Sequence, residues 1–136
     1  MIEIISGEKG KGKTKELLNK VNTSITSATG NIVYLDKSQK HMYELNNKIR
    51  LINVNDFLID NCDEFLGFIC GVISQDHDLE EMYLDSFLTI ASIDSDELLN
   101  HAIQKLDVIS EKYNLSVSKD ESKLTDIAKA KIVISL

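Results

Sequence analysis

Three glycines, a lysine and a threonine near the start of the chain have the types and spacing needed to bind phosphate groups. They lie in the segment from Gly7 to Thr14, which reads G-E-K-G-K-G-K-T. Glycines let the backbone turn through conformations that other residues disfavour, so that successive main-chain N–H groups can approach phosphate oxygens. The lysine before the final threonine supplies positive charge, and the threonine hydroxyl group is a ligand for Mg²⁺. We therefore expect this segment to bind a phosphorylated ligand.

The spacing G-x-x-x-x-G-K-T is that of the P-loop, or Walker A motif. A chance match is expected roughly 0.004 times in a chain with this content of glycine, lysine, serine and threonine. The flanking residues agree with the motif, because the apolar stretch from Ile2 to Ser6 predicts a strand before it. An amphipathic helix, beginning at about Gly12, is predicted after it by the spacing of Leu17, Leu18, Val21 and Ile25. Such a helix would direct its first N–H groups and its positive dipole end at the phosphates.

The ligand expected from this motif is ATP with Mg²⁺. Lys13 is the candidate for binding the β and γ phosphates, and Thr14 is the candidate metal ligand. Lys9, Lys11 and Lys15 add positive charge to an acidic chain and are weaker candidates. The segment expected to contact the nucleotide comprises Gly7, Glu8, Lys9, Gly10, Lys11, Gly12, Lys13, Thr14 and Lys15.

A P-loop ordinarily works with a carboxylate from another strand, which supports the Mg²⁺ ion. Two aspartates are candidates. Asp36 ends the apolar run N-I-V-Y-L-D that begins at residue 31, and Asp85 follows the weaker run M-Y-L. A buried parallel strand delivers a carboxylate in this position to the carboxyl edge of its sheet. The order of the two along the chain favours Asp85 as the Mg²⁺ residue.

Strands are predicted to alternate with helices along the chain. The strands after the first are expected at 31–36, 48–54, 81–91, 115–118 and 131–136. The helices after the first are expected at 56–75 with a break near 60–63, from a capping box formed by Asp94 and Glu97 to about Tyr113, and at 122–130. This alternation predicts an α/β fold, a three-layer α/β/α sandwich with a mainly parallel sheet that binds its ligand at the carboxyl ends of the strands. We expect a single domain over residues 1–136.

These motifs, in this succession, resemble the RecA-like branch of the P-loop NTPases over residues 2 to about 119. The segment from Tyr83 to Ser86 is similar to the Walker B motif of that branch, in which an apolar run ends in Asp-Ser. The resemblance implies a RecA-like P-loop fold in which Asp85 supports the Mg²⁺ ion. It also implies that Ser118 or Lys119 contacts the γ-phosphate.

The chain departs from the RecA-like pattern at residues that promote hydrolysis. The recombinases carry a glutamate just past the second strand to orient the attacking water, whereas this chain has Asp36-Lys37-Ser38 there. Other P-loop ATPases carry it directly after the Walker B aspartate, where Ser86 stands. Either Asp36 activates the water or hydrolysis is slow, and Asp36 can also be interpreted as a residue that caps the turn after its strand. Arg50 is the only arginine, so fast hydrolysis would need positive charge from a partner protein or a second copy.

These features predict an ATP-binding protein, a Mg²⁺-dependent ATPase with weak or partner-stimulated hydrolysis. The alternative is a non-hydrolysing subunit that senses nucleotide and regulates or binds a protein partner. A small-molecule kinase is a third possibility, although such enzymes usually use several arginines to bind two phosphorylated substrates.

Composition limits the partners and the compartment. The net charge of −7 argues against nucleic-acid binding by the chain alone, because that affinity comes mostly from neutralising phosphates. No apolar run approaches the length of a membrane span and no signal peptide is evident, so we expect a cytoplasmic protein with no membrane contact. Cys62 and Cys70 are expected to be buried thiols. The histidines form no metal-binding or nucleophile pattern and are expected at the surface: His41, His77 and His101.

Overall fold

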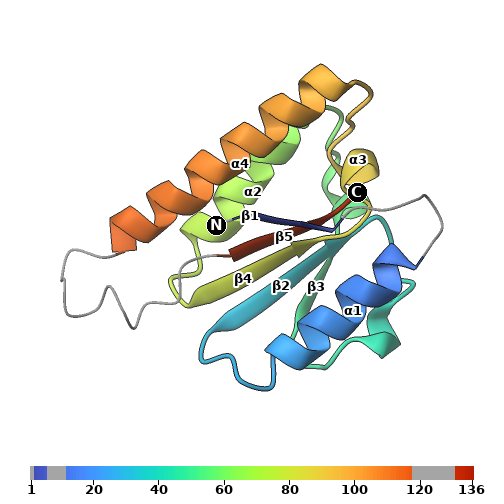
Figure 1. The fold of residues 1–136 in the computed structure, drawn as a ribbon, viewed down its shortest axis with the longest axis vertical. Helices are drawn as coiled ribbons and strands as arrows, with labels where there is room; N and C mark the ends of the chain where they lie inside the picture. Colours follow the sequence, from blue (N-terminus) through green and yellow to red (C-terminus); the bar gives the residue numbers. More distant parts are fainter. Residues whose placement is uncertain (1, 6–11, 118–130) are drawn as a thin grey trace.

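The computed structural model describes residues 2–5, 12–117 and 131–136 of the chain, and Figure 1 shows the arrangement of its elements. Its centre is one sheet of five strands in the order β1-β5-β4-β2-β3, and all neighbouring pairs are parallel. The strands are β1 (Ile2–Ile5), β2 (Asn31–Asp36), β3 (Arg50–Asn53), β4 (Leu79–Leu84) and β5 (Lys131–Ser135). The predicted α/β class and parallel sheet are confirmed.

Helices cover both faces of this sheet and make three layers (Figure 1). One face carries α1 (Lys13–Ser24), and the other carries α2 (Cys62–Ser74) and α4 (Asp96–Val117). The remaining helical turns are short: η1 (Met42–Glu44), η2 (Val54–Phe57) and α3 (Phe87–Ile90). Because both faces are covered, β2 is buried at every residue after its first.

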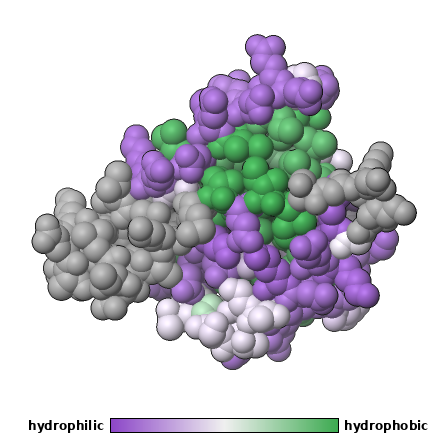
Figure 2. Space-filling model, in the orientation of Figure 1, coloured by the Kyte–Doolittle hydropathy of each residue, from purple (hydrophilic) through white to green (hydrophobic). Residues whose placement is uncertain are grey.

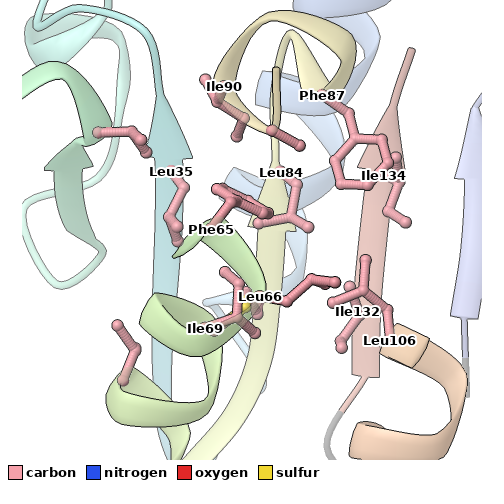
Figure 3. Packing of buried hydrophobic residues seen from close by; sticks show 14 of the residues in the cluster. Leu35, Phe65, Leu66, Ile69, Leu84, Phe87, Ile90, Leu106, Ile132 and Ile134 are labelled. Atoms are coloured by element: carbon pink, nitrogen blue, oxygen red, sulfur yellow. The ribbon is translucent and has the colours of Figure 1, made fainter. Parts of the chain in front are cut away.

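The α2 side of the sheet holds the larger core. In the orientation of Figure 1, apolar residues gather near the middle of the visible face and hydrophilic residues border them (Figure 2). Asn61 caps α2 by accepting a hydrogen bond from the Glu64 N–H group at 2.9 Å, and apolar residues then recur at helical spacing. Figure 3 shows side chains of α2 directed at those of the strands. Phe65 of α2 meets Phe87 of α3 edge to face, with ring centroids 6.0 Å apart. The expected interior position of this apolar helix is confirmed, and its predicted break corresponds to the gap between η2 and α2.

The α1 side is tied to β4 by polar groups as well as by apolar contacts. Leu17, Leu18 and Val21 of α1 are buried against the sheet. At the carboxyl end of α1, the Ser24 hydroxyl group donates to the Glu81 carboxylate at 2.7 Å, and the buried Tyr83 hydroxyl group donates to the same carboxylate at 2.6 Å. These bonds fix the carboxyl end of α1, which lies far from Gly12.

Two predicted strands are wrong in their extent. The strand expected at 81–91 begins at Leu79 and ends at Leu84, because Ser86 adopts a left-handed conformation (φ 54°) and α3 follows. Phe87, Ile90 and Ala91 are buried at the i, i+3, i+4 spacing of a helix. The strand expected at 115–118 is also wrong for 115–117, where α4 continues to Val117.

Two local predictions are also corrected. The cap of α4 is Ser95, whose hydroxyl group accepts a hydrogen bond from the Leu98 N–H group at 3.1 Å, and not the predicted pair Asp94 and Glu97. Cys62 is buried as expected, but Cys70 is exposed because it lies on the outer side of α2. The predicted helix at 122–130 lies outside the described residues. In the part of the chain that the structure describes, no helix is both long and apolar enough to cross a lipid bilayer.

Candidate functional site

A cleft of about 430 Å³ opens at the carboxyl edge of the sheet, where three strands and α1 converge. The start of α1 borders it on one side, and the residues that follow β2, β4 and β5 border it on the others. Its lining among the described residues is Gly12, Lys13, Thr14, Lys37, Asp85, Ser86, Thr89, Ser135 and Leu136. Ligands of open parallel sheets bind at this edge, so the cleft lies where the fold predicts a binding site.

Gly12 sets the direction in which the chain enters α1. Its φ angle of 79° is in the left-handed region, which glycine adopts without the steric cost that a Cβ atom imposes. Its carbonyl oxygen accepts the first helical hydrogen bond, from the Glu16 N–H group at 3.0 Å. Because glycine has no capping side chain, the first turn of α1 presents its N–H groups and its positive dipole end to the cleft.

Thr14 and Asp85 meet across this cleft. The Thr14 hydroxyl group donates a hydrogen bond to Asp85 Oδ1 at 3.2 Å. Asp85 follows β4 directly, and its N–H group donates to the Leu35 carbonyl oxygen at 2.9 Å, which holds it against β2. Only 1% of Asp85 is exposed, so its carboxylate depends on hydrogen-bond donors from the protein in place of water.

The second oxygen of Asp85 has a donor of its own. The Tyr34 hydroxyl group, from the buried strand β2, donates to Asp85 Oδ2 at 2.7 Å. Burial, followed by the negative charge of Asp85, raises the pKa of Tyr34 above its ordinary value. The phenol therefore keeps its proton and remains a donor throughout the physiological pH range.

Asp36 lies at the same edge but is bonded differently. It is 2% exposed, and its Oδ1 atom accepts a hydrogen bond from the Lys37 N–H group at 2.7 Å. Its Oδ2 atom is buried and has no hydrogen-bond partner among the described residues. Burial raises the pKa of Asp36, the Lys37 N–H bond acts against that shift, and the charge of Asp85 adds to it. Asp36 is thus a buried carboxyl group whose charged form is disfavoured.

The structure brings together part of the residue set predicted from the sequence. Gly12, Lys13, Thr14 and Asp85 line the cleft. Lys15 does not line the cleft but borders a neighbouring hollow between α1 and the η1 region, together with His41 and Glu44, whose side chains are 2.9 Å apart. Arg50 begins β3, pairs with Val33 in the middle of β2 and does not line the cleft. The other residues predicted to bind nucleotide lie outside the described part of the chain: Gly7, Glu8, Lys9, Gly10, Lys11 and Ser118.

Sequence reasoning missed several residues of this site. Tyr34 has the pattern of a core residue in an apolar strand, and nothing in its neighbours indicates that its hydroxyl group reaches a carboxylate. Lys37 lines the cleft because it follows β2, and Thr89 lines it because it lies in α3, the short helix after β4. Ser135 ends β5, which lies between β1 and β4, so its position depends on a strand order that the sequence does not reveal.

The donors in the cleft fit a magnesium ion better than a transition metal. No group of three or more His, Cys, Asp or Glu side chains that could hold a metal ion occurs among the residues that the structure describes. Mg²⁺ binds through one or two carboxylates together with substrate phosphates and water, and does not need such a cage. The Thr14 hydroxyl oxygen and the Asp85 carboxylate are the hard oxygen donors that Mg²⁺ prefers.

Comparison of the sequence with models of known protein families gives no match, and comparison with curated proteins gives none either. The function is therefore argued from the chemistry of this site.

Proposed function

We propose that the chain is an ATP-binding P-loop protein of the RecA-like type, which binds ATP and Mg²⁺ in the cleft at the carboxyl edge of its sheet. The observation that supports the proposal most directly is the contact between Thr14 and Asp85. In P-loop NTPases the Mg²⁺ ion is held by the threonine or serine of the loop and by an aspartate at the end of another strand. Here a threonine after G-K and an aspartate after β4 meet at 3.2 Å, beside Lys13.

Each of these residues has a distinct role in the proposal. Lys13 binds the β and γ phosphates, and the N–H groups at the start of α1 bind phosphate oxygens. The Thr14 hydroxyl group can donate a hydrogen bond to Asp85 while its oxygen lone pairs remain for the metal. Bound Mg²⁺ supplies neutralisation of the phosphate charge. Asp85 fits this role because its buried carboxylate already has donors on both oxygens and so has a fixed orientation.

Hydrolysis by the chain alone is proposed to be slow. The Asp36 Oδ2 atom is buried and Asp36 is not among the described residues that line the cleft, which is a poor position for orienting the attacking water. Ser86 stands directly after Asp85 and has no carboxylate. Arg50 pairs with Val33 in the middle of β2 and does not line the cleft. A partner protein or a second copy of the chain would have to supply the missing groups for fast turnover.

A thermal-unfolding titration with ATP, ADP and GTP, each with and without Mg²⁺, tests the proposal. At a free concentration a thousandfold above the dissociation constant, a ligand raises the free energy of unfolding by about 4 kcal/mol. We expect such stabilisation with ATP and Mg²⁺, and we expect Asp85→Asn to lose the part that depends on Mg²⁺. Absence of stabilisation by any of the nucleotides would contradict the proposal.

The alternative is a subunit that binds nucleotide without hydrolysing it and is read by a protein partner. The buried Asp36 and the position of Arg50 away from the cleft lining favour this alternative over a fast enzyme. Phosphate release by the purified chain distinguishes the two. Steady release that is lost in Asp85→Asn would exclude the non-hydrolysing subunit, whereas binding of ATP without release would favour it.

A further inference from the structure

Two hydrogen bonds link Thr14 at the start of α1, through Asp85, to Tyr34 in the interior. Asp85 Oδ1 accepts from Thr14 at 3.2 Å, and Asp85 Oδ2 accepts from Tyr34 at 2.7 Å. Tyr34 is fully buried on β2, which pairs with β4, the strand that carries Asp85. Tyr34 does not line the cleft, so it can act on a ligand there only through Asp85.

The Tyr34 hydroxyl group restricts the rotation of the Asp85 carboxylate. A carboxylate can turn about its last side-chain bond, and a donor on only one oxygen leaves that rotation loosely constrained. With Tyr34 on Oδ2, the plane of the carboxylate is fixed and Oδ1 is directed at Thr14. Strand pairing fixes the donor in turn, because Tyr34 lies opposite Tyr83 in the register of β2 and β4.

A second buried tyrosine, Tyr83, allows the effect of the Tyr34 hydrogen bond to be distinguished from simple core packing. Tyr83 stacks on Tyr34, with ring centroids 6.3 Å apart and an angle of 14° between the ring planes. Its hydroxyl group also donates to a carboxylate of β4, that of Glu81, at 2.6 Å. Glu81 bonds to Ser24 at the far end of α1 and does not line the cleft. The two tyrosines therefore share burial and a carboxylate acceptor, and only Tyr34 bonds to the carboxylate at the cleft.

We propose that Tyr34 is a positioning residue of the magnesium site, which holds Asp85 so that its Oδ1 atom meets Thr14 and the metal. This inference rests on the proposed binding of ATP and Mg²⁺. Groups that orient a metal-supporting side chain typically change metal affinity by about 10- to 100-fold when they are removed. The Tyr34 hydroxyl group is such a group because it bonds to Asp85, whereas the Tyr83 hydroxyl group bonds to Glu81 and is not.

The test compares Tyr34→Phe with Tyr83→Phe in the full chain. Each substitution deletes one buried hydroxyl group and keeps the ring, so the cost to folding is similar for the two variants. Two quantities are measured by calorimetric titration: the affinity for ATP in the presence of a chelator, and the affinity of the ATP complex for Mg²⁺. Thermal unfolding without ligand reports any loss of stability, and Tyr34→Phe in an Asp85→Asn background tests whether the effect passes through Asp85.

We expect Tyr34→Phe to lower the Mg²⁺ affinity of the ATP complex by about tenfold or more. The affinity for ATP measured in the presence of a chelator should change by less than about twofold. Tyr83→Phe should leave both affinities unchanged, and Tyr34→Phe should have little further effect once Asp85 is Asn. Equal effects of the two tyrosine substitutions on Mg²⁺ affinity, or none from Tyr34→Phe, would overturn the inference and leave the proposed function standing. A wild-type chain that binds neither ATP nor Mg²⁺ would overturn both.

Discussion

Asp36 and Asp85 follow paired residues of neighbouring strands, yet their carboxyl groups are bonded in opposite ways. Leu35 of β2 lies opposite Leu84 of β4, and the next residue in each chain segment is one of the two aspartates. Asp85 has a hydroxyl donor on each oxygen, from Thr14 and from Tyr34, whereas Asp36 Oδ2 has no partner in the described part of the chain. The same edge thus holds one carboxyl group with a donor on each oxygen and one whose charged form is disfavoured by burial.

Asp36→Asn is expected to stabilise the protein at neutral pH. The pKa of Asp36 is raised in the folded state by burial, so the folded protein binds its proton more tightly than the unfolded chain does. The stability that this group contributes is therefore fully present below about pH 3.9, the pKa of an aspartate in the unfolded chain. It is lost as the pH rises through the higher pKa that Asp36 has in the folded protein. The amide in Asp36→Asn does not titrate, so the variant does not lose this stability as the pH rises. Chemical denaturation at several pH values measures the difference.

The control for this prediction is Asp107→Asn, on the exposed side of α4. The difference in stability from wild type should depend more strongly on pH for Asp36→Asn, at a buried residue, than for this exposed control. A free energy of unfolding for Asp36→Asn that falls further below wild type as the pH rises would contradict the assignment of Asp36 as a buried group with a raised pKa.

Gly30→Ala is expected to destabilise the fold by about 1–3 kcal/mol, because the added carbon has no room. A Cβ atom at Gly30 would collide with the carbonyl oxygen of Asp78, where β2 begins to pair with β4. The Gly30 N–H group also donates to Glu80 at 3.0 Å, so a shift of this backbone breaks a further bond. Urea denaturation measures the loss.

Gly67→Ala is the matched control, with the opposite sign expected. Gly67 lies within α2, and a Cβ atom there meets nothing within 4 Å. Alanine has the higher helix propensity, so the substitution should stabilise the protein by about 0.5–1 kcal/mol. Equal destabilisation by the two substitutions would show that the close approach of Gly30 to Asp78 has no special importance.

Phe65→Ala is expected to cost about 3–5 kcal/mol of stability. Phe65 is fully buried between α2 and the sheet and meets Phe87 of α3. Its loss removes the support of α3, which carries Thr89 of the cleft. Tyr43→Ala, at a residue that is 92% exposed, should change stability by less than about 0.5 kcal/mol. A loss at Phe65 no greater than that at Tyr43 would contradict the described core.

The sequence predicts the fold well where apolar runs are continuous and bounded by turns. Strand β2 was predicted with its observed limits, because a run of buried residues ends in Asp36. The start of strand β4 was predicted two residues too late, because Glu80 and Glu81 are polar and do not continue an apolar run. In the structure their carboxylates bond to the backbone at Gly30 and to Ser24, partners distant in the chain. Local periodicity carries no information about such bonds.

The residues of the candidate site that belong to one sequence motif could be predicted. Those that strand pairing brings to the site could not. Lys13 and Thr14, which line the cleft, were predicted from spacing alone, and Asp85 was preferred to Asp36 for its order along the chain. Tyr34 has no such signal, because the same residue type would fill the core equally well. Its role depends on the parallel register of β2 and β4, which brings its hydroxyl group to Asp85.

The most direct test of nucleotide binding is a calorimetric titration of three proteins with ATP and Mg²⁺: wild type, Lys13→Ala, and Lys48→Ala, which removes an exposed lysine before β3. The account predicts that wild type and Lys48→Ala bind with the same affinity, and that Lys13→Ala loses binding because the charge on the β and γ phosphates is no longer neutralised. Unchanged affinity in Lys13→Ala would contradict it.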